Sequence, residues 1–205
     1  MPLGLCSSRC HLLKGYGGRE VRRKTNHRGN LGKSLFMVSV AMFLFITALT
    51  LAETPPPEVE WERTFGGPEW DGASSVQQTS DGGYIVAGST RSYGAGDFDF
   101  WLVKVDPDGD LQWSKTFGGP NDEVANSVQQ TTDGGYIVAG WTASYGAGWH
   151  DFWLVKVDPD GDLQWSKTFG GPLHEEAYSV QQTSDGGYIG AGYTCLLYTS
   201  PSPRD

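Results

Sequence analysis

The sequence predicts an all-β protein, an incomplete β-propeller of four-stranded antiparallel blades that is preceded by a signal peptide. Trp61, Trp113 and Trp165 open three copies of one unit with a period of 52 residues. Each copy contains short runs of β-branched and aromatic residues between glycine-rich turns, which is the pattern of antiparallel strands. A fixed period of about 50 residues is typical of propellers and related repeat arrays.

The repeats occupy most of this 205-residue chain. The first two copies are identical at 40 of 52 positions and are aligned without insertion or deletion, and the third follows the same pattern until it is truncated. About 2.5 repeats are therefore present, at residues 61–112, 113–164 and 165–194.

The segment before the repeats has the pattern of an export signal. Residues 1–52 carry eight basic residues against one acid, and Leu35–Leu51 is almost wholly apolar. Thr50 and Ala52 place small residues where a signal peptidase requires them, so we expect cleavage after Ala52. Residues 53–60 would then form a Pro-rich linker. An uncleaved signal anchor is the alternative, and its basic segment would stay in the cytoplasm.

Charge and cysteine content limit the partners and the compartment. From residue 53 onward the chain has 7 basic and 23 acidic residues, which disfavours nucleic acid and anionic lipid as partners. A membrane enters this interpretation only through the uncleaved anchor. Residues 53–194 contain no cysteine, so the fold must rely on a buried core rather than on disulfides. We expect a secreted or cell-surface protein of a prokaryote.

The last residues break the repeat pattern. Cys195–Asp205 replaces the expected continuation of the third copy with an unrelated string. This string resembles translated sequencing-adapter DNA, and we expect residues 195–205 to be non-native and the natural protein to continue. A genuine short C-terminus is the alternative.

Each full unit is expected to form four strands. Ser80–Gly83 is a tight hairpin turn, because Asp-Gly and Gly-Gly supply the positive φ angles that such turns need. The third strand is almost continuously apolar, which is typical of a strand covered on both faces. A second turn at Asp106–Asp110 contains Pro and Gly. The expected strands of the first copy are Ala73–Thr79, Tyr84–Gly88, Phe100–Val105 and Leu111–Phe117.

These residues support a family comparison. Asp99–Pro107 followed by Trp113, with Tyr84–Gly88 before it, resembles a divergent kelch-type blade and is similar to uncharacterised repeats of exported bacterial and archaeal propeller-like proteins. The resemblance covers residues 61–194. Kelch repeats have a glycine pair where this sequence has the single Gly88. A β-helix or another solenoid is the rival architecture.

The start of the repeats indicates how a ring could close. Trp61–Phe65 matches the fourth strand of a blade whose first three strands are absent. We expect a last blade to supply those three strands, since known propellers contain about four to eight blades. Residues 53–194 alone would leave sheet edges open, and we expect them to aggregate.

Differences between the copies indicate where a ligand could bind. They gather in the loop before the first strand and the loop after the second, which emerge on one face of an up-and-down blade. Binding residues tend to occupy loops on a rigid scaffold, so we predict a face that binds a glycan or a protein. Neutral variation of surface loops is the alternative. The predicted face carries Trp70, Asp71, Trp141, Trp149, His150 and His174.

No catalytic motif is recognisable. The sequence contains no Ser-His-Asp, Cys-His or HExxH arrangement, and we predict no catalytic residue, cofactor or metal. Asp106, Asp108 and Asp110 are better interpreted as a hairpin turn than as a calcium loop, because Leu111 and Phe117 stand where such a loop needs Gly and Glu. The runner-up function is a secreted carbohydrate-active enzyme, a glycoside hydrolase or lyase, whose site lies in missing blades.

Overall fold

The computed structural model describes residues 10–16 and 58–194. The expectations about most of the leader, the cleavage point after Ala52 and the tail at 195–205 concern residues outside these ranges. The chain forms two compact units, one containing residues 1–13 and 61–205 and the other residues 14–60. Among the described residues, no helix has the length and apolar character needed to cross a membrane.

All regular elements of the described ranges are β-strands. They are β1 (Cys10–Tyr16), β2 (Glu58–Phe65), β3 (Asp71–Gln78), β4 (Tyr84–Thr90), β5 (Asp99–Val105), β6 (Leu111–Phe117), β7 (Glu123–Gln130), β8 (Tyr136–Thr142), β9 (Asp151–Val157), β10 (Leu163–Phe169), β11 (Glu175–Gln182) and β12 (Tyr188–Thr194).

Each full repeat forms one four-stranded antiparallel sheet, as the sequence predicts. The strand order is β3-β4-β5-β6 in the first repeat and β7-β8-β9-β10 in the second, and β11 and β12 form a hairpin. The fourth strand has the predicted bounds. The first strand begins two residues earlier than predicted, and the second ends two residues later, because Asp71 pairs with Thr90 in the ladder.

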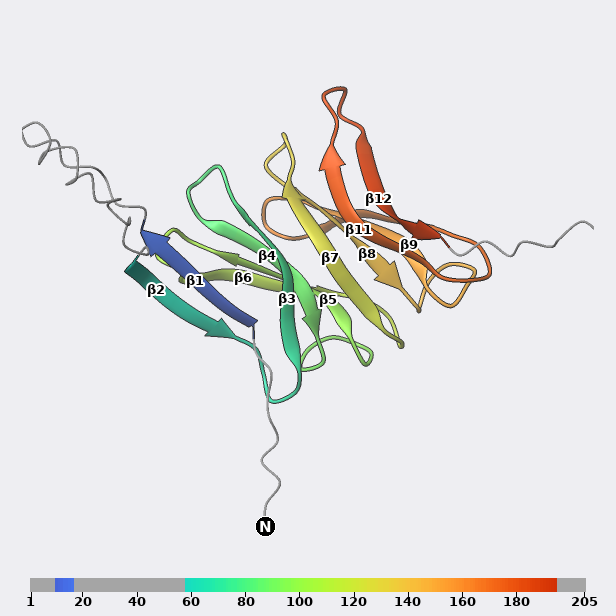
Figure 1. The fold of residues 1–205 in the computed structure, drawn as a ribbon, viewed down its shortest axis with the longest axis horizontal. Coiled ribbons are helices and arrows are strands. Elements are labelled where there is room, and N and C mark those ends of the chain that lie inside the picture. The colour runs from blue at the N-terminus through green and yellow to red at the C-terminus, as the bar shows by residue number, and fades with distance from the viewer. Residues whose placement is uncertain (1–9, 17–57, 195–205) are drawn as a thin grey trace, which may run out of the picture. The chain divides into compact units, whose positions relative to one another are not determined.

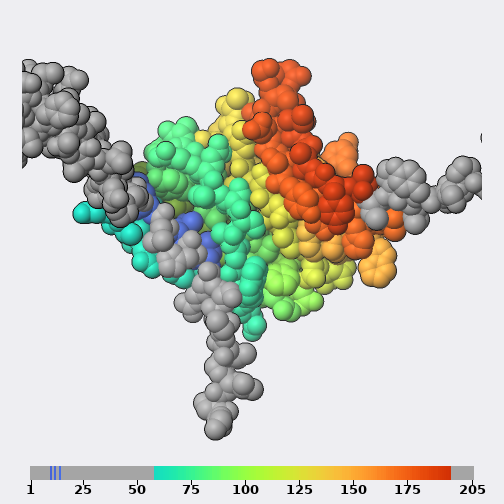
Figure 2. All heavy atoms as spheres, in the orientation of Figure 1, coloured from blue at the N-terminus to red at the C-terminus, as the bar shows by residue number. Residues whose placement is uncertain are grey.

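Successive sheets pack face to face and form the core. Ile85, Phe100 and Leu102 of the first repeat are fully buried against Val138 and Val155 of the second. The other face of the second sheet packs in turn against β11 and β12 of the third repeat. Figure 1 shows the sheets in chain order, and Figure 2 shows them as successive green, yellow and orange-red bands. The described sheets do not close into a ring.

Glutamine side chains bond each repeat to the next. Gln77 Oε1 accepts a hydrogen bond from the backbone N–H of Gln130 at 2.6 Å, and Gln129 Oε1 accepts one from Gln182 at the same distance. Gln130 Oε1 accepts from the N–H of Ser80 at 2.8 Å. The same glutamine contact therefore recurs one period later, at the second junction.

The last strand of one repeat also covers the next. The ring of Trp113 on β6 meets Tyr136 of the second repeat edge-on, with ring centroids 5.8 Å apart. Trp61 meets Tyr84 in the same manner at 5.9 Å, and its Nε1 donates to the carbonyl of Pro107 at 3.1 Å. Trp61 on β2 thus has the packing position of a fourth-strand residue, as expected from the repeat pattern.

Strand β1 is a difference from the sequence analysis, which assigned no strand to the basic leader. It pairs with β2, whose first residues were expected to belong to the linker. Cys10 and Leu12 are buried with Val86 and Trp101 of the first repeat, and burial, followed by the charge of Asp71, raises the pKa of the Cys10 thiol to about 11. The physical reason is that an open sheet edge accepts an extended segment.

A buried lysine lies in the third strand of each four-stranded sheet. Lys104 is 3 % exposed. Its Nζ donates to Asp81 Oδ2 at 2.9 Å, to Gln112 Oε1 at 2.9 Å and to the carbonyl of Val105 at 3.1 Å. All three N–H groups of the ammonium therefore have acceptors, which offsets the cost of burying the charge. Lys156 repeats the arrangement with Asp133.

These contacts predict an acid-sensitive stability. Hydrogen bonds from Thr131 and Lys156 lower the pKa of Asp133 from 3.8 to about 2, and Asp81 is shifted in the same way. A carboxylate with a lowered folded-state pKa stabilises the fold above pH 3.8, and the stabilisation is lost as the pH falls towards 2. The two carboxylates are half exposed, so each contributes about 1 kcal/mol or less.

Urea denaturation between neutral pH and pH 2 would measure this dependence. We expect Asp133→Asn to unfold more easily at neutral pH and to lose less free energy of unfolding on acidification than the parent. Asp108→Asn, in an exposed turn, is the control. If Asp133→Asn and the parent lost the same free energy of unfolding on acidification, Asp133 would not be the source of the acid sensitivity.

Candidate functional site

A buried acid at the start of each first strand holds the two variable loops together. Asp71 is 1 % exposed. Its Oδ2 accepts from the N–H of Gly67 at 2.7 Å and from Ser92 Oγ at 2.8 Å, and its Oδ1 accepts from the hydroxyl of Thr90. One carboxylate thus joins the loop before β3 to the loop after β4.

The second and third repeats keep this contact with a glutamate. Glu123 accepts from the N–H of Gly119 at 2.7 Å and from Thr142 Oγ1 at 2.7 Å, and Glu175 accepts from the N–H of Gly171 at 2.8 Å. In the sequence, the role of Asp71 is indicated by the acid that stands at this position in all three copies. Its side chain is directed into its own repeat, so the structure places Asp71 beneath the predicted binding face rather than on it.

A second buried acid orders the longer loop. Asp99 Oδ2 accepts from the N–H groups of Ala95 and Gly96 at 2.9 and 3.2 Å. The carboxylates of Asp99 and Glu123 approach Gly118 from two sides, and a Cβ there would collide with both. The glycine is therefore required by the close approach of the backbone to two acids.

Backbone bonds join the variable loops of successive repeats. The N–H of Glu123 donates to the carbonyl of Phe98 at 2.7 Å, and the N–H of Glu175 donates to that of His150 at 2.8 Å. Each junction between repeats therefore brings a loop of one repeat beside a loop of the next, on the same scaffold but with different side chains.

Four of the six predicted residues meet at the junction of the second and third repeats. The ring of His150 stacks on Trp141, with centroids 3.8 Å apart and an interplanar angle of 11°. The ring of His174 meets that of His150 edge-on, with centroids 4.5 Å apart, and its centroid lies 6.0 Å from that of the Trp149 ring. We call Trp141, Trp149, His150 and His174 the aromatic cluster.

Glu176 and two tyrosines extend this cluster and were not predicted from the sequence. Glu176 Oε1 lies 3.1 Å from His150 Nδ1 and accepts from the hydroxyl of Tyr193 at 3.2 Å. Tyr178 stacks beside Tyr193 with centroids 5.9 Å apart. The signal in the sequence was that Glu176 replaces Gly72 and Val124 of the other copies.

Trp70 lies apart from the aromatic cluster. It is 43 % exposed and meets Phe98 edge-on, with centroids 5.2 Å apart. The guanidinium of Arg91 lies 4.9 Å from the centroid of the same phenyl ring. Trp70 therefore belongs to a separate contact within the first repeat.

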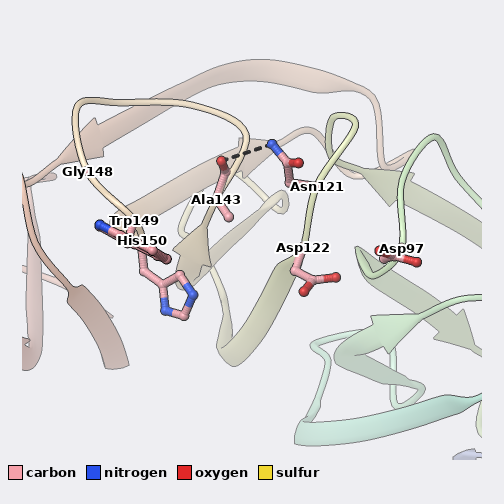
Figure 3. Close-up of a pocket in the computed structure, with 7 residues that line it drawn as sticks. All are labelled: Asp97, Asn121, Asp122, Ala143, Gly148, Trp149 and His150. Atoms are coloured by element: carbon pink, nitrogen blue, oxygen red, sulfur yellow. Dashed lines mark hydrogen bonds between the residues drawn. The ribbon is translucent and has the colours of Figure 1, made fainter.

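An open cavity of about 460 Å³ lies between the loops of the first and second repeats. Figure 3 shows Trp149 and His150 on one side and Asp97 and Asp122 on the other. Trp149 is 72 % exposed. Asn121 Nδ2 donates to the carbonyl of Ala143 at 3.2 Å across the middle. The cavity is lined by Asp97, Asn121, Asp122, Ala143, Gly148, Trp149 and His150.

The opposite end of the repeats carries the aspartate turns. Asp106 Oδ1 accepts from the N–H groups of Asp108 and Asp110, both at 2.9 Å, and Asp110 pairs with Arg63 at 3.2 Å. Asp106 and Asp110 are thus engaged within the fold. In the described part of the chain, no group of three or more His, Cys, Asp or Glu residues is placed to hold a metal ion.

Comparisons with known proteins add structural likenesses alone. No family model matches the chain, and no curated protein matches it. A solved structure of a protein of unknown function from Bacteroides caccae has a TM-score of 0.44 and 15 % sequence identity. The match covers 65 % of this chain and 42 % of the other, so this chain spans less than half of that protein.

The buried acid can be tested by an isosteric change. Glu123→Gln replaces one acceptor oxygen with an NH₂ group that faces donors. We expect the free energy of unfolding to fall by about 1–3 kcal/mol, the typical cost of an unsatisfied buried polar group. Chemical denaturation measures the change, with Asp108→Asn as the exposed control. If Glu123→Gln does not fold, Thr142→Ala is the alternative: it removes one donor to Glu123 and the acceptor of the Ser144 and Tyr145 N–H groups, and should cost about 1–3 kcal/mol. If the folded Glu123→Gln variant were as stable as the parent, Glu123 would not hold the loops together.

Proposed function

We propose that this chain is part of an exported β-propeller of divergent kelch-like repeats that binds a carbohydrate at the variable loop end. The observation that carries the proposal is Trp149, an indole 72 % exposed on the wall of a cavity that also holds carboxylate and amide groups. Such rings stack on the apolar faces of sugars. A few polar groups fix the orientation of a ligand in a site of this kind.

The contacts around the cavity support a preformed site. Asp122 Oδ1 accepts from the N–H of Phe98 at 3.2 Å, and Asp97 pairs with Arg91 at 2.9 Å. The loops that carry these residues are fixed from below by Glu123 and Asp99. A sugar therefore meets polar groups whose positions are already set, which lowers the entropic cost of binding.

The fold supports the propeller that the proposal includes, and the sequence supports the export. Four-stranded sheets bury both faces against their neighbours, and Trp61 has the packing position of a fourth-strand residue. Both are features of propeller blades. The apolar segment of the leader and the cysteine-free repeats support a location outside the cell.

Binding of the full chain to an array of oligosaccharides, followed by calorimetric titration, tests this function. We expect Trp149→Ala to weaken binding about tenfold or more, equivalent to about 1.4 kcal/mol. Trp70→Ala is the matched control and should change Kd less than about twofold, since Trp70 lies outside the cavity.

Two results would contradict the proposal. The first is the absence of binding to every oligosaccharide by a correctly folded protein. The second is equal binding by the parent and Trp149→Ala, because it would place the sugar elsewhere. Binding of protein partners through the same cavity, without sugar binding, would favour a protein ligand.

A further inference from the structure

We infer that the cavity selects a cationic sugar, an oligosaccharide with free primary amines of the glucosamine type. This inference rests on the proposed carbohydrate-binding function and specifies its ligand class. It follows from the charges that line and underlie the cavity, together with the exposed indole on its wall.

The lining residues include two carboxylates and no lysine or arginine. The nearby cation is Arg91, which is held by Asp97 at 2.9 Å and by the ring of Phe98. Asp122 accepts one backbone N–H and, among the described residues, forms no ion pair. An ammonium group of a ligand would supply the cationic partner that Asp122 lacks.

The acids beneath the cavity add to this negative potential. Asp99 and Glu123 are almost fully buried. Their hydrogen-bond partners are neutral N–H and hydroxyl groups, such as those of Gly96 and Thr142. In the part of the chain that the structure describes, no basic side chain forms an ion pair with either acid. The potential at the loops above them therefore favours a cation over a neutral ligand.

The aromatic wall suits the same ligand. Trp149 provides an exposed indole, and the neighbouring His150 is stacked on Trp141. An indole face attracts an ammonium group as well as the C–H face of a sugar ring. An amino sugar combines both groups in one residue, so it can contact the indole and Asp122 together.

The two carboxylates that line the cavity are particular to the junction of the first two repeats, whereas the acid at the second junction, Glu176, is bonded to His150 and Tyr193. The positions of Asp97 and Asp122 are occupied by Trp149 and His174 at the next junction. The backbone bond from Glu123 to Phe98 recurs as that from Glu175 to His150, but the N–H of Phe98 bonds the side chain of Asp122, whereas that of His150 bonds the carbonyl of Leu173. We therefore place the amine at the first junction and the sugar face over Trp149.

Calorimetric titration of the full chain with three oligomers of equal length tests the inference. The probes are glucosamine, N-acetylglucosamine and glucose oligomers at one pH and low salt. We expect the free amine to bind about tenfold more tightly than the acetylated and neutral oligomers, and added salt to reduce that preference.

Asp122→Asn is the decisive variant, because its amide oxygen can still accept the N–H of Phe98. We expect this variant to bind the glucosamine and N-acetylglucosamine oligomers with nearly equal Kd, while the Kd of the acetylated oligomer stays as in the parent. Asp108→Asn, which removes an equal charge from an exposed turn at the opposite end, should keep the full preference.

The outcomes separate this inference from the function on which it rests. Equal binding of all three oligomers would overturn the amine selectivity and leave carbohydrate binding in place. No binding of any of the three would overturn the amine selectivity, and the oligosaccharide array would decide whether carbohydrate binding stands. A preference that survives Asp122→Asn would overturn the assigned residue. A lysine tripeptide that binds as tightly as the glucosamine oligomer would show recognition of charge alone and overturn the sugar ligand.

Discussion

The variable loops depend on a buried carboxylate at the start of the first strand of every repeat. Asp71, Glu123 and Glu175 each accept an N–H from the loop before that strand and a hydroxyl from the end of the second strand. Because several donors converge on one acid, the loops are fixed without disulfides. Burying an acid is costly unless its oxygens are satisfied, and here the backbone of the loops satisfies them.

This support lets the repeats vary in side chains without varying in backbone. The glutamine contacts and Trp–Tyr contacts recur at both junctions with nearly the same distances. The residues displayed above them differ: the first junction presents Asp97 and Asp122, and the second presents Trp149 and His174. A repeat array of this kind can therefore place different chemistry side by side on one surface, and the cavity lies where the acidic and aromatic parts meet.

The sequence was sufficient to predict the strands, because turns rich in Asp and Gly bound short β-branched runs in every copy. Comparison of the copies separates fixed positions from variable ones, and it predicted one face carrying Trp70, Asp71, Trp141, Trp149, His150 and His174. In the structure, Trp141, Trp149, His150 and His174 of this set lie together. The direction of a side chain could not be predicted. Asp71 lies in a variable stretch but is buried, and Lys104 lies in an apolar strand but is neutralised by Asp81 from a turn 23 residues earlier. The repeat pattern predicts an open edge at Trp61–Phe65, but it does not specify that the leader pairs there as β1.

Hydrogen exchange at the amides of Gly67, Gly119 and Gly171 would test the role of the buried acids most directly. These N–H groups belong to loops, yet each donates to a buried carboxylate. The account predicts that the three amides exchange as slowly as those of the central strands β4 and β8, since the loops would open only when the repeat unfolds. Fast exchange, at the rate of an exposed loop, would show that the acids do not hold the loops and would remove the physical basis of a preformed site.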